Sequence, residues 1–148
     1  MTFVDSVSVD TATGRAEGAL FVDAAADYLA DHFPSAPTVP GLVMLETAVR
    51  TATALWRARA VEAQSLVAVL ERIDRLHVLR RVVPGETLVV RVQMTGDRDA
   101  NGSVGFQAEG VVGEQIAIRS RFLLRQVDIT GGHDRWDTGG VNDSRGDR

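Results

Sequence analysis

Apolar and polar residues alternate along most of this chain, and the alternation predicts strands. A period of two is typical of half-buried strands, whose successive side chains point to opposite faces of a sheet. Turn-forming residues separate these segments, and Asn101-Gly102 is a strong hairpin signal, which favours an antiparallel sheet. The predicted strands are residues 3–9, 15–22, 65–79, 87–94, 103–112 and 115–127, with a bulge near Ile73-Asp74.

A helical period replaces the alternation between Leu42 and about Ala60, after a short helix or loop over residues 23–31. The predicted buried face is Leu42, Leu45, Val49, Ala52 and Trp56, beside a mostly polar stripe of Val43, Glu46, Arg50, Thr53 and Arg57. Glu46 is therefore expected at the edge of the core. One helix covers one face of the sheet if the sheet wraps around it. The other face would then expose Val90 and Val92, which a dimer would cover.

The composition narrows the class of protein. The 148 residues are 45% hydrophobic, which is enough for one domain with a core. The net charge of −4 argues against nucleic acid as a partner, and no apolar run approaches the roughly 20 residues of a membrane span. The chain has no cysteine and no lysine, and its first residues lack the features of a signal peptide. We therefore expect a cytoplasmic protein without disulfides or a catalytic lysine.

The domain is expected over residues 1–128. Residues 129–148 are rich in Gly, Asp and Arg and poor in apolar side chains, so they are expected to form a disordered tail.

A proline-braced loop before the helix carries the candidate chemistry. Its prolines at positions 34, 37 and 40 restrict the backbone around His32, and Pro40-Gly41 then leads into the helix that bears Glu46. A rigid loop suits a group that must transfer a proton at a defined place. One imidazole and one carboxylate tied to the start of the same helix form a candidate acid/base pair.

This loop and helix resemble the hot-dog-fold 3-hydroxyacyl-[acyl-carrier-protein] dehydratases of fatty acid synthesis. His32-Phe33-Pro34, Pro37, Pro40-Gly41 and Glu46 stand at the spacing of that family's motif. A second segment, Arg80-Arg81-Val82-Val83-Pro84-Gly85-Glu86, is similar to the family's Arg-x-Val-x-Pro-Gly-Asp turn. The resemblance covers roughly residues 3–127. It implies an α+β hot-dog fold, in which an antiparallel sheet of about six strands wraps around one long central helix.

The resemblance also implies a reaction, the loss of water from a (3R)-3-hydroxyacyl thioester to give a trans-2-enoyl thioester in fatty acid or polyketide biosynthesis. His32 would remove the α-proton, and Glu46, from the partner subunit of a homodimer or higher oligomer, would handle the hydroxyl. After Pro40, the N–H groups of Gly41 and Leu42 would bind the thioester oxygen. An acyl carrier protein or CoA would carry the substrate, and neither a metal nor another cofactor is implied. A glutamate rather than an aspartate resembles the non-isomerising branch of the family.

Three positions depart from the family pattern. Ser35 stands where the family usually has Gly, Ala36 replaces a commonly polar residue, and Arg50 stands where the family usually has Gln. Arg50 follows Glu46 by four residues, the order that favours an ion pair on a helix surface. A close guanidinium favours the carboxylate over the carboxylic acid, which would weaken Glu46 as a proton donor. An Arg50 that points to solvent or to the substrate would remove this conflict.

Plainer interpretations remain for each residue. His32 could be a loop histidine bonded to backbone, Glu46 and Arg50 a solvated pair, and Pro40-Gly41 only a helix start. Candidates for contact with an acidic carrier protein or a pantetheine phosphate are Arg72, Arg75, Arg80 and Arg81, although surface solvation explains them as well.

Two other functions also stay open. A hot-dog thioesterase would use Glu46 as base or nucleophile, although thioester hydrolysis does not require the loop histidine. A non-catalytic acyl-binding or dimer-partner subunit would fit the unusual Arg50 and Ser35.

His77 and His133 are expected to be structural, and no metal-ligand spacing occurs.

Overall fold

The computed structural model describes residues 2–60, 66–96 and 99–128. The predicted tail and Ser65, the expected start of the third strand, lie outside these ranges. The elements agree with the predicted ones to within a few residues at each end. They are β1 (Ser6–Asp10), β2 (Arg15–Phe21), the 3-10 helix η1 (Asp27–Leu29), α1 (Gly41–Arg59), β3 (Leu66–Val78), β4 (Thr87–Met94), β5 (Ser103–Val112) and β6 (Gln115–Asp128).

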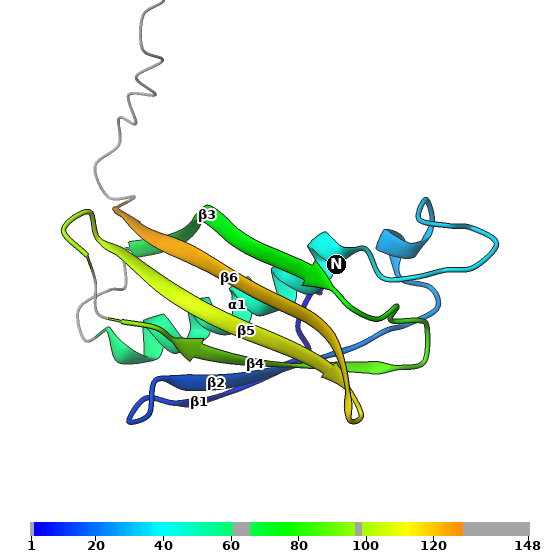
Figure 1. Ribbon diagram of the computed structural model, residues 1–148, viewed down its shortest axis with the longest axis horizontal. Coiled ribbons are helices and arrows are strands. Elements are labelled where there is room, and N and C mark those ends of the chain that lie inside the picture. The colour runs from blue at the N-terminus through cyan, green and yellow to red at the C-terminus, as the bar shows by residue number, and fades with distance from the viewer. Residues whose placement is uncertain (1, 61–65, 97–98, 129–148) are drawn as a thin grey trace, which may run out of the picture.

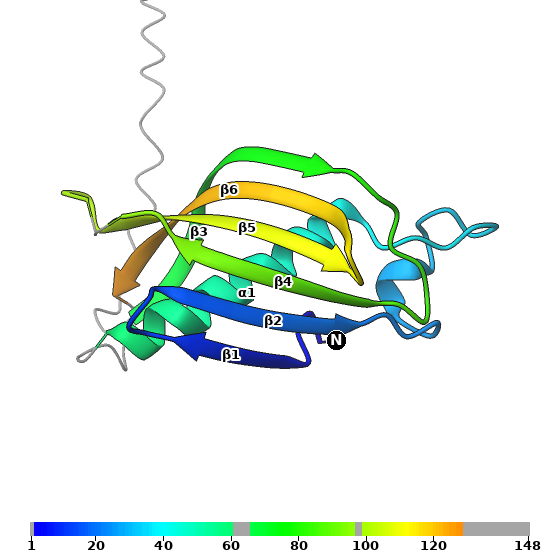
Figure 2. The ribbon, with the colours of Figure 1, turned by 60° about the horizontal axis from the view of Figure 1, so that its bottom comes forward.

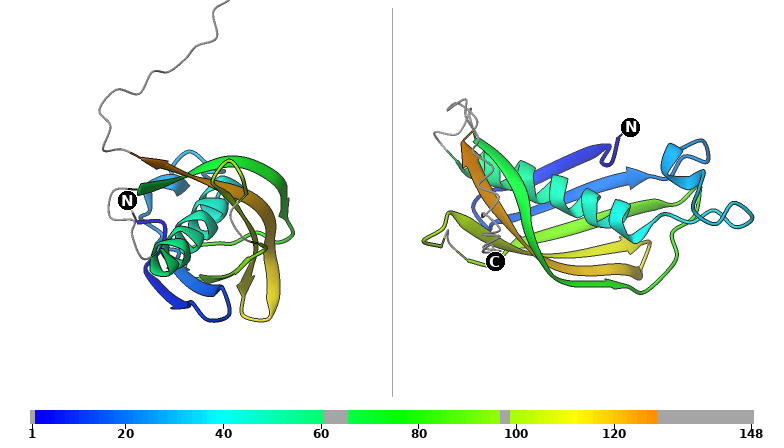
Figure 3. Two further views of the ribbon diagram at one scale, coloured as in Figure 1. Left: turned by 90° about the vertical axis from the view of Figure 1, so that its left-hand side faces the viewer. Right: turned by 90° about the horizontal axis from the view of Figure 1, so that it is seen from above.

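The strands form one antiparallel sheet, as the hairpins predicted, and their order in it is β1-β2-β4-β5-β6-β3. Figure 2 shows this order face on, and the left view of Figure 3 shows the sheet curling around α1. Strand β3 is an edge strand whose pairing with β6 shifts register between Leu70 and Arg72 and again between Ile73 and Arg75. The second shift is the predicted bulge. No helix in the described ranges is long and apolar enough to cross a membrane.

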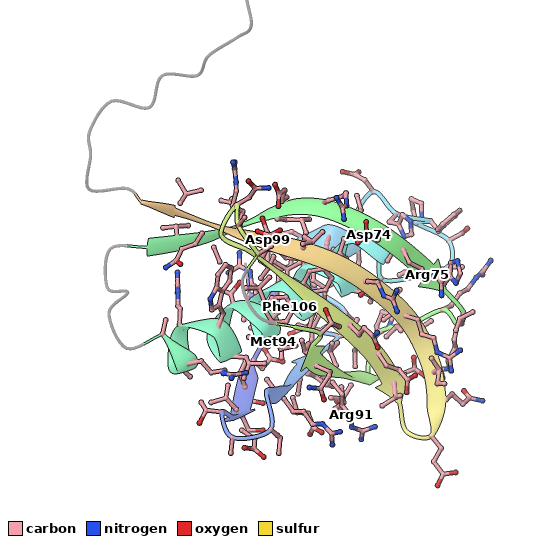
Figure 4. The ribbon with its side chains drawn as sticks, turned by 60° about the vertical axis from the view of Figure 1, so that its left-hand side comes forward. Asp74, Arg75, Arg91, Met94, Asp99 and Phe106 are labelled. Atoms are coloured by element: carbon pink, nitrogen blue, oxygen red, sulfur yellow. The ribbon has the colours of Figure 1, made fainter. Side chains whose placement is uncertain are left out.

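The faces of β4 are the reverse of the prediction. Val90 and Val92 are 0% and 2% exposed, because they belong to the side of the sheet that packs on α1. The polar residues between them, Arg91 and Gln93, lie on the outer side, where Arg91 pairs with Glu17 of β2. Figure 4 shows the same division, with Phe106 directed toward α1 and Arg91 directed away from it. The outer face of the sheet therefore does not require a dimer to cover these two valines.

The buried face of α1 is wider than predicted. It includes Leu45, Val49, Ala52 and Trp56 of the predicted face but not Leu42. Its least exposed side chains include Met44, Ala48 and Leu55, whereas Leu42 is 68% exposed. At 100° per residue, Leu42 and Glu46 both project away from the line through these buried residues. The prediction that Leu42 belongs to the core is therefore wrong. Glu46 also lies on the open side of the helix rather than at the edge of the core, with a side chain 38% exposed.

Close contact between helix and sheet depends on a small residue in β2. A Cβ at Gly18 would lie 2.1 Å from Thr51 Oγ1 of α1, so only glycine permits this approach. Further along the helix, Trp56 packs against Phe106, which stacks on Phe122 with ring centroids 5.8 Å apart. These contacts fix how α1 lies in the sheet and so where its first turn emerges.

Candidate active site

The loop that bears His32 extends from the end of the molecule where α1 begins (Figures 1 and 3). The half-buried imidazole has its Nδ1 2.8 Å from the carbonyl oxygen of Thr38 and 3.2 Å from Thr38 Oγ1. A carbonyl oxygen only accepts hydrogen bonds, so the tautomer that suits this contact carries the proton on Nδ1. The other ring nitrogen, Nε2, then has a lone pair and is equipped to act as a base.

Backbone contacts hold this loop in shape. The His32 N–H donates to the Leu29 carbonyl at 3.3 Å, and the Ala36 N–H donates to the Phe33 carbonyl at 2.9 Å. Phe33 has a positive φ of 56°, which is uncommon for a bulky residue, and its ring meets the imidazole edge-on at 4.6 Å between centroids. A backbone held in such a conformation marks a site that its surroundings determine closely.

The second predicted motif anchors the loop. The Val39 N–H donates to the Val82 carbonyl at 2.8 Å, which ties the end of the loop to the turn after β3. Within that turn, Glu86 accepts hydrogen bonds from Arg80 at 2.6 and 2.8 Å and from the Val83 N–H at 3.0 Å. These hydrogen bonds, that from Arg80 above all, lower the pKa of Glu86 to about 2.

The four arginines proposed as a carrier-binding cluster are therefore not equivalent. Arg80 serves the turn described above, and Arg72 pairs with Asp74 at 2.6 Å. Arg75 and Arg81 are exposed and remain candidates for contact with an anionic partner.

The first turn of α1 presents backbone donors. The Pro40 carbonyl accepts from the N–H groups of Val43 and Met44 at 2.9 and 3.2 Å, so the helix begins at Gly41. The N–H groups of Gly41 and Leu42 have no acceptor within the helix and form part of its positive end. A Cβ on Gly41 would lie 2.9 Å from Val78 Cγ2, so glycine lets the end of β3 approach this turn. The arrangement suits an oxygen that gains negative charge.

Glu46 and Arg50 form the ion pair that their spacing predicts. Arg50 Nε donates to Glu46 Oε1 at 2.8 Å, and the Arg50 guanidinium carbon lies 5.2 Å from the centroid of the Phe3 ring. Of the contacts described within this chain, none joins Glu46 to His32. Nor do any three His, Asp or Glu side chains in the described ranges lie close enough together to hold a metal ion.

Two residues that contact the candidate site residues were not predicted from the sequence. Thr38 supplies the partner of His32 Nδ1, and a search for a polar residue on the same short loop could have found it. Phe3 and Arg50 are 47 residues apart in the sequence, and no local sequence pattern predicts a contact between them.

Comparison with known proteins places this chain in a family. The family model of ApeI-like proteins, described as ApeI dehydratase, matches residues 8–118, which include the loop, the helix and both motifs. The chain belongs to the ApeI-like dehydratase family. A relative of this ApeI-like chain is the 3-hydroxyacyl-[acyl-carrier-protein] dehydratase FabZ of Chloroflexus aggregans. The two are 33% identical over 116 residues, which cover 78% of each chain.

Solved structures confirm the hot-dog fold of this ApeI-like protein. The dehydratase heterocomplex ApeI:P from Xenorhabdus doucetiae superposes with a TM-score of 0.54 at 19% identity, over 76% of this chain and 88% of that one. A hot-dog-like protein from Thermanaerovibrio acidaminovorans superposes with a TM-score of 0.62 at 16% identity, over 85% and 84%. At these identities the superpositions establish the fold alone.

Proposed function

We propose that this protein removes water from a 3-hydroxyacyl thioester, linked to a carrier protein or to CoA, and forms the trans-2-enoyl thioester. The observation that carries the proposal is the hydrogen bond from His32 Nδ1 to the Thr38 carbonyl, which leaves Nε2 as a base on a rigid loop. Membership of a dehydratase family supports the same reaction. The proposal includes a cytoplasmic setting, fatty acid or polyketide synthesis as the pathway, and no cofactor beyond the pantetheine that carries the substrate.

Removal of the α-proton is assigned to His32. Nε2 takes this proton, and the electrons of the C–H bond become the Cα=Cβ bond as the Cβ–O bond breaks. Negative charge that develops on the thioester oxygen is met by the N–H groups of Gly41 and Leu42, at the positive end of α1.

The leaving oxygen needs one proton to depart as water. Because Arg50 donates to Glu46, the carboxylate is suited to accept a hydrogen bond from the substrate hydroxyl and to orient it. The proton that completes the water is then the one that His32 has just taken. His32 returns to its neutral form, and the substrate has lost one hydrogen and one hydroxyl group.

A homodimer is part of the proposal, because no described contact joins His32 and Glu46 within one chain. The unpaired edge of β3 carries apolar side chains that are 36–54% exposed, namely Val69, Leu70, Ile73, Val78 and, just after the strand, Leu79. An exposed apolar edge strand is a surface that a second chain can cover.

Ile73→Glu is expected to convert a dimer into an inactive monomer. Light scattering would measure the mass, and the absorbance of the enoyl product would measure the activity. An active, monodisperse wild-type monomer would refute this part.

The reaction is tested by incubating the protein with crotonyl and 3-hydroxybutyryl thioesters of pantetheine and CoA and measuring the absorbance of the enoyl thioester over time. His32→Ala is expected to lower kcat/KM by at least about 100-fold, and Glu46→Gln by at least about 10-fold. Mixing these two impaired variants tests the shared site. In a mixed dimer one of the two sites has both native residues, so up to about a quarter of the wild-type activity should return. A site built within one chain would regain nothing.

A second candidate is a non-catalytic subunit that binds acyl groups or pairs with another hot-dog chain. The occupation of Glu46 by Arg50 favours it, because that contact removes one of the acceptor positions of the carboxylate. Tight binding of an acyl-pantetheine without turnover, unchanged in His32→Ala, would support this role. Release of free thiol from an acyl-CoA would instead indicate a thioesterase.

A further inference from the structure

Hydrogen bonds at Phe3 and at Asp5 hold the N-terminal segment before β1. Thr47 Oγ1 of α1 donates to the Phe3 carbonyl at 2.7 Å. Two residues later, the Asp5 N–H donates to the Ala19 carbonyl at 2.7 Å, and the Asp5 carboxylate accepts from the Phe21 N–H at 2.6 Å. The backbone of this segment is therefore fixed to both the helix and β2, and the place of the Phe3 side chain is set by the fold.

The Phe3 ring contacts two side chains from other parts of the chain. It stacks on Tyr28 with centroids 6.5 Å apart and an interplanar angle of 27°, and the Arg50 guanidinium lies 5.2 Å from its centroid. The ring is half-buried and packs against the hydrophobic core. A guanidinium over an aromatic face at this distance is a cation–π contact.

This contact changes what the Glu46–Arg50 pair can do. Arg50 is 52% exposed, and an exposed ion pair one helical turn apart contributes little and holds its geometry weakly. The Phe3 ring restricts the guanidinium from a second direction. With Nε committed to Glu46 Oε1 at 2.8 Å, the other carboxylate oxygen, Oε2, is left for a different partner.

We infer that Phe3 and Arg50 are positioning residues for Glu46, so that the N-terminal segment is part of the active site. The inference rests on the proposed function, in which Glu46 accepts the substrate hydroxyl. The ring of Phe3 holds the guanidinium, the guanidinium holds Oε1, and Oε2 is presented to the hydroxyl in one orientation. Small displacements of a reacting group lower rates steeply, so even a half-exposed arginine matters here.

The first test measures kcat and KM separately. Arg50→Met keeps most of the aliphatic stem and removes the donor, and it should lower kcat by roughly 10- to 100-fold with KM within about 3-fold. Phe3→Leu keeps an apolar side chain and removes the aromatic face, and it should lower kcat by about 3- to 10-fold. The double variant should be no slower than Arg50→Met alone, because both substitutions interrupt the same series of contacts from Phe3 through Arg50 to Glu46.

Matched controls separate positioning from general stability. Phe21→Leu removes an exposed aromatic ring from β2, and Arg119→Met breaks an exposed ion pair with Glu109 on the outer face. Both should retain wild-type kcat. If Phe3→Leu and Arg50→Met lower only the melting temperature, or if their effects on kcat multiply, the two residues do not act through Glu46 and the inference is wrong.

A second readout does not require turnover. The Arg50 Nε–H resonance, assigned in the full chain by its loss in Arg50→Met, should be shifted by the Phe3 ring and protected from exchange by Glu46. Phe3→Leu and Glu46→Gln should each move it and speed its exchange, and an unmoved resonance would overturn the inference. A wild-type protein without dehydratase activity would count against the proposed function, whereas an active wild type with unaffected Phe3 and Arg50 variants would count against this inference alone.

Discussion

Substitution of Glu86 by glutamine should weaken the turn that anchors the loop bearing His32. The two Glu86 oxygens accept three hydrogen bonds, two from Arg80 and one from the Val83 N–H. In Glu86→Gln an NH2 group replaces one oxygen, so a donor then faces another donor. The ionic part of the contact with Arg80 is lost at the same time.

The magnitude follows from the pKa of Glu86, which falls from its ordinary 4.5 to about 2. At 1.36 kcal/mol per pH unit this corresponds to about 3 kcal/mol, and partial exposure of both side chains reduces the expected effect to about 2 kcal/mol. A loss of this size should lower the melting temperature by about 8 °C. Because folding lowers the pKa, the contribution is complete above pH 4.5 and disappears as the pH falls toward 2.

The assay is urea unfolding of the wild type and Glu86→Gln between pH 7 and pH 2. The two curves should differ by about 2 kcal/mol at neutral pH and converge in acid. Glu109→Gln is the control, since its side chain and that of its partner Arg119 are 43% and 53% exposed, and loss of this pair should cost less than about 0.5 kcal/mol. A difference that persists at pH 2, or a Glu86→Gln effect no larger than that of Glu109→Gln, would refute the reasoning.

Two further predictions concern the helix and the loop. Gly18→Ala places a methyl group 2.1 Å from Thr51 Oγ1, so unfolding should become easier by about 1–3 kcal/mol. Denaturant titration would measure this, and Thr51→Ala should recover part of the loss. Thr38→Val removes the hydroxyl near His32 but keeps the carbonyl that accepts from Nδ1, so kcat should stay within about 3-fold of wild type. A fall beyond about 10-fold would show that the hydroxyl, rather than the carbonyl, orients the imidazole.

The strands, the helix and the loop motif were predictable because their signals are local. Alternation gives two faces to β4, but it does not say which face meets the helix, and for this reason Val90 and Val92 were assigned to the wrong side. Leu45, Val49, Ala52 and Trp56 are buried as the helical spacing predicts, whereas Leu42 is exposed because the buried line of α1 passes away from it. That line is set by where the sheet contacts the helix, which a spacing pattern does not contain.

In the candidate site, too, contacts between residues close in sequence were predictable and contacts between distant residues were not. The ion pair of Glu46 with Arg50 follows from four-residue spacing within one helix, and the structure contains it. The partner of His32 and the ring beside Arg50 depend on how a loop folds and where a distant segment docks. The roles assigned to His32, Glu46, Gly41 and Leu42 remain predictions until the variants are assayed.

The two register shifts of β3 bear on how this domain tolerates insertions and deletions. The strand places its thirteen residues, Leu66–Val78, opposite the β6 residues that run from Ile118 to Asp128. Each extra residue exchanges the two faces for everything beyond it, and the second exchange restores the original order. Loss of one residue from β3 would therefore turn its distal half inside out, whereas loss of both extra residues would preserve it. Length variation among homologues is expected to occur here in steps of two.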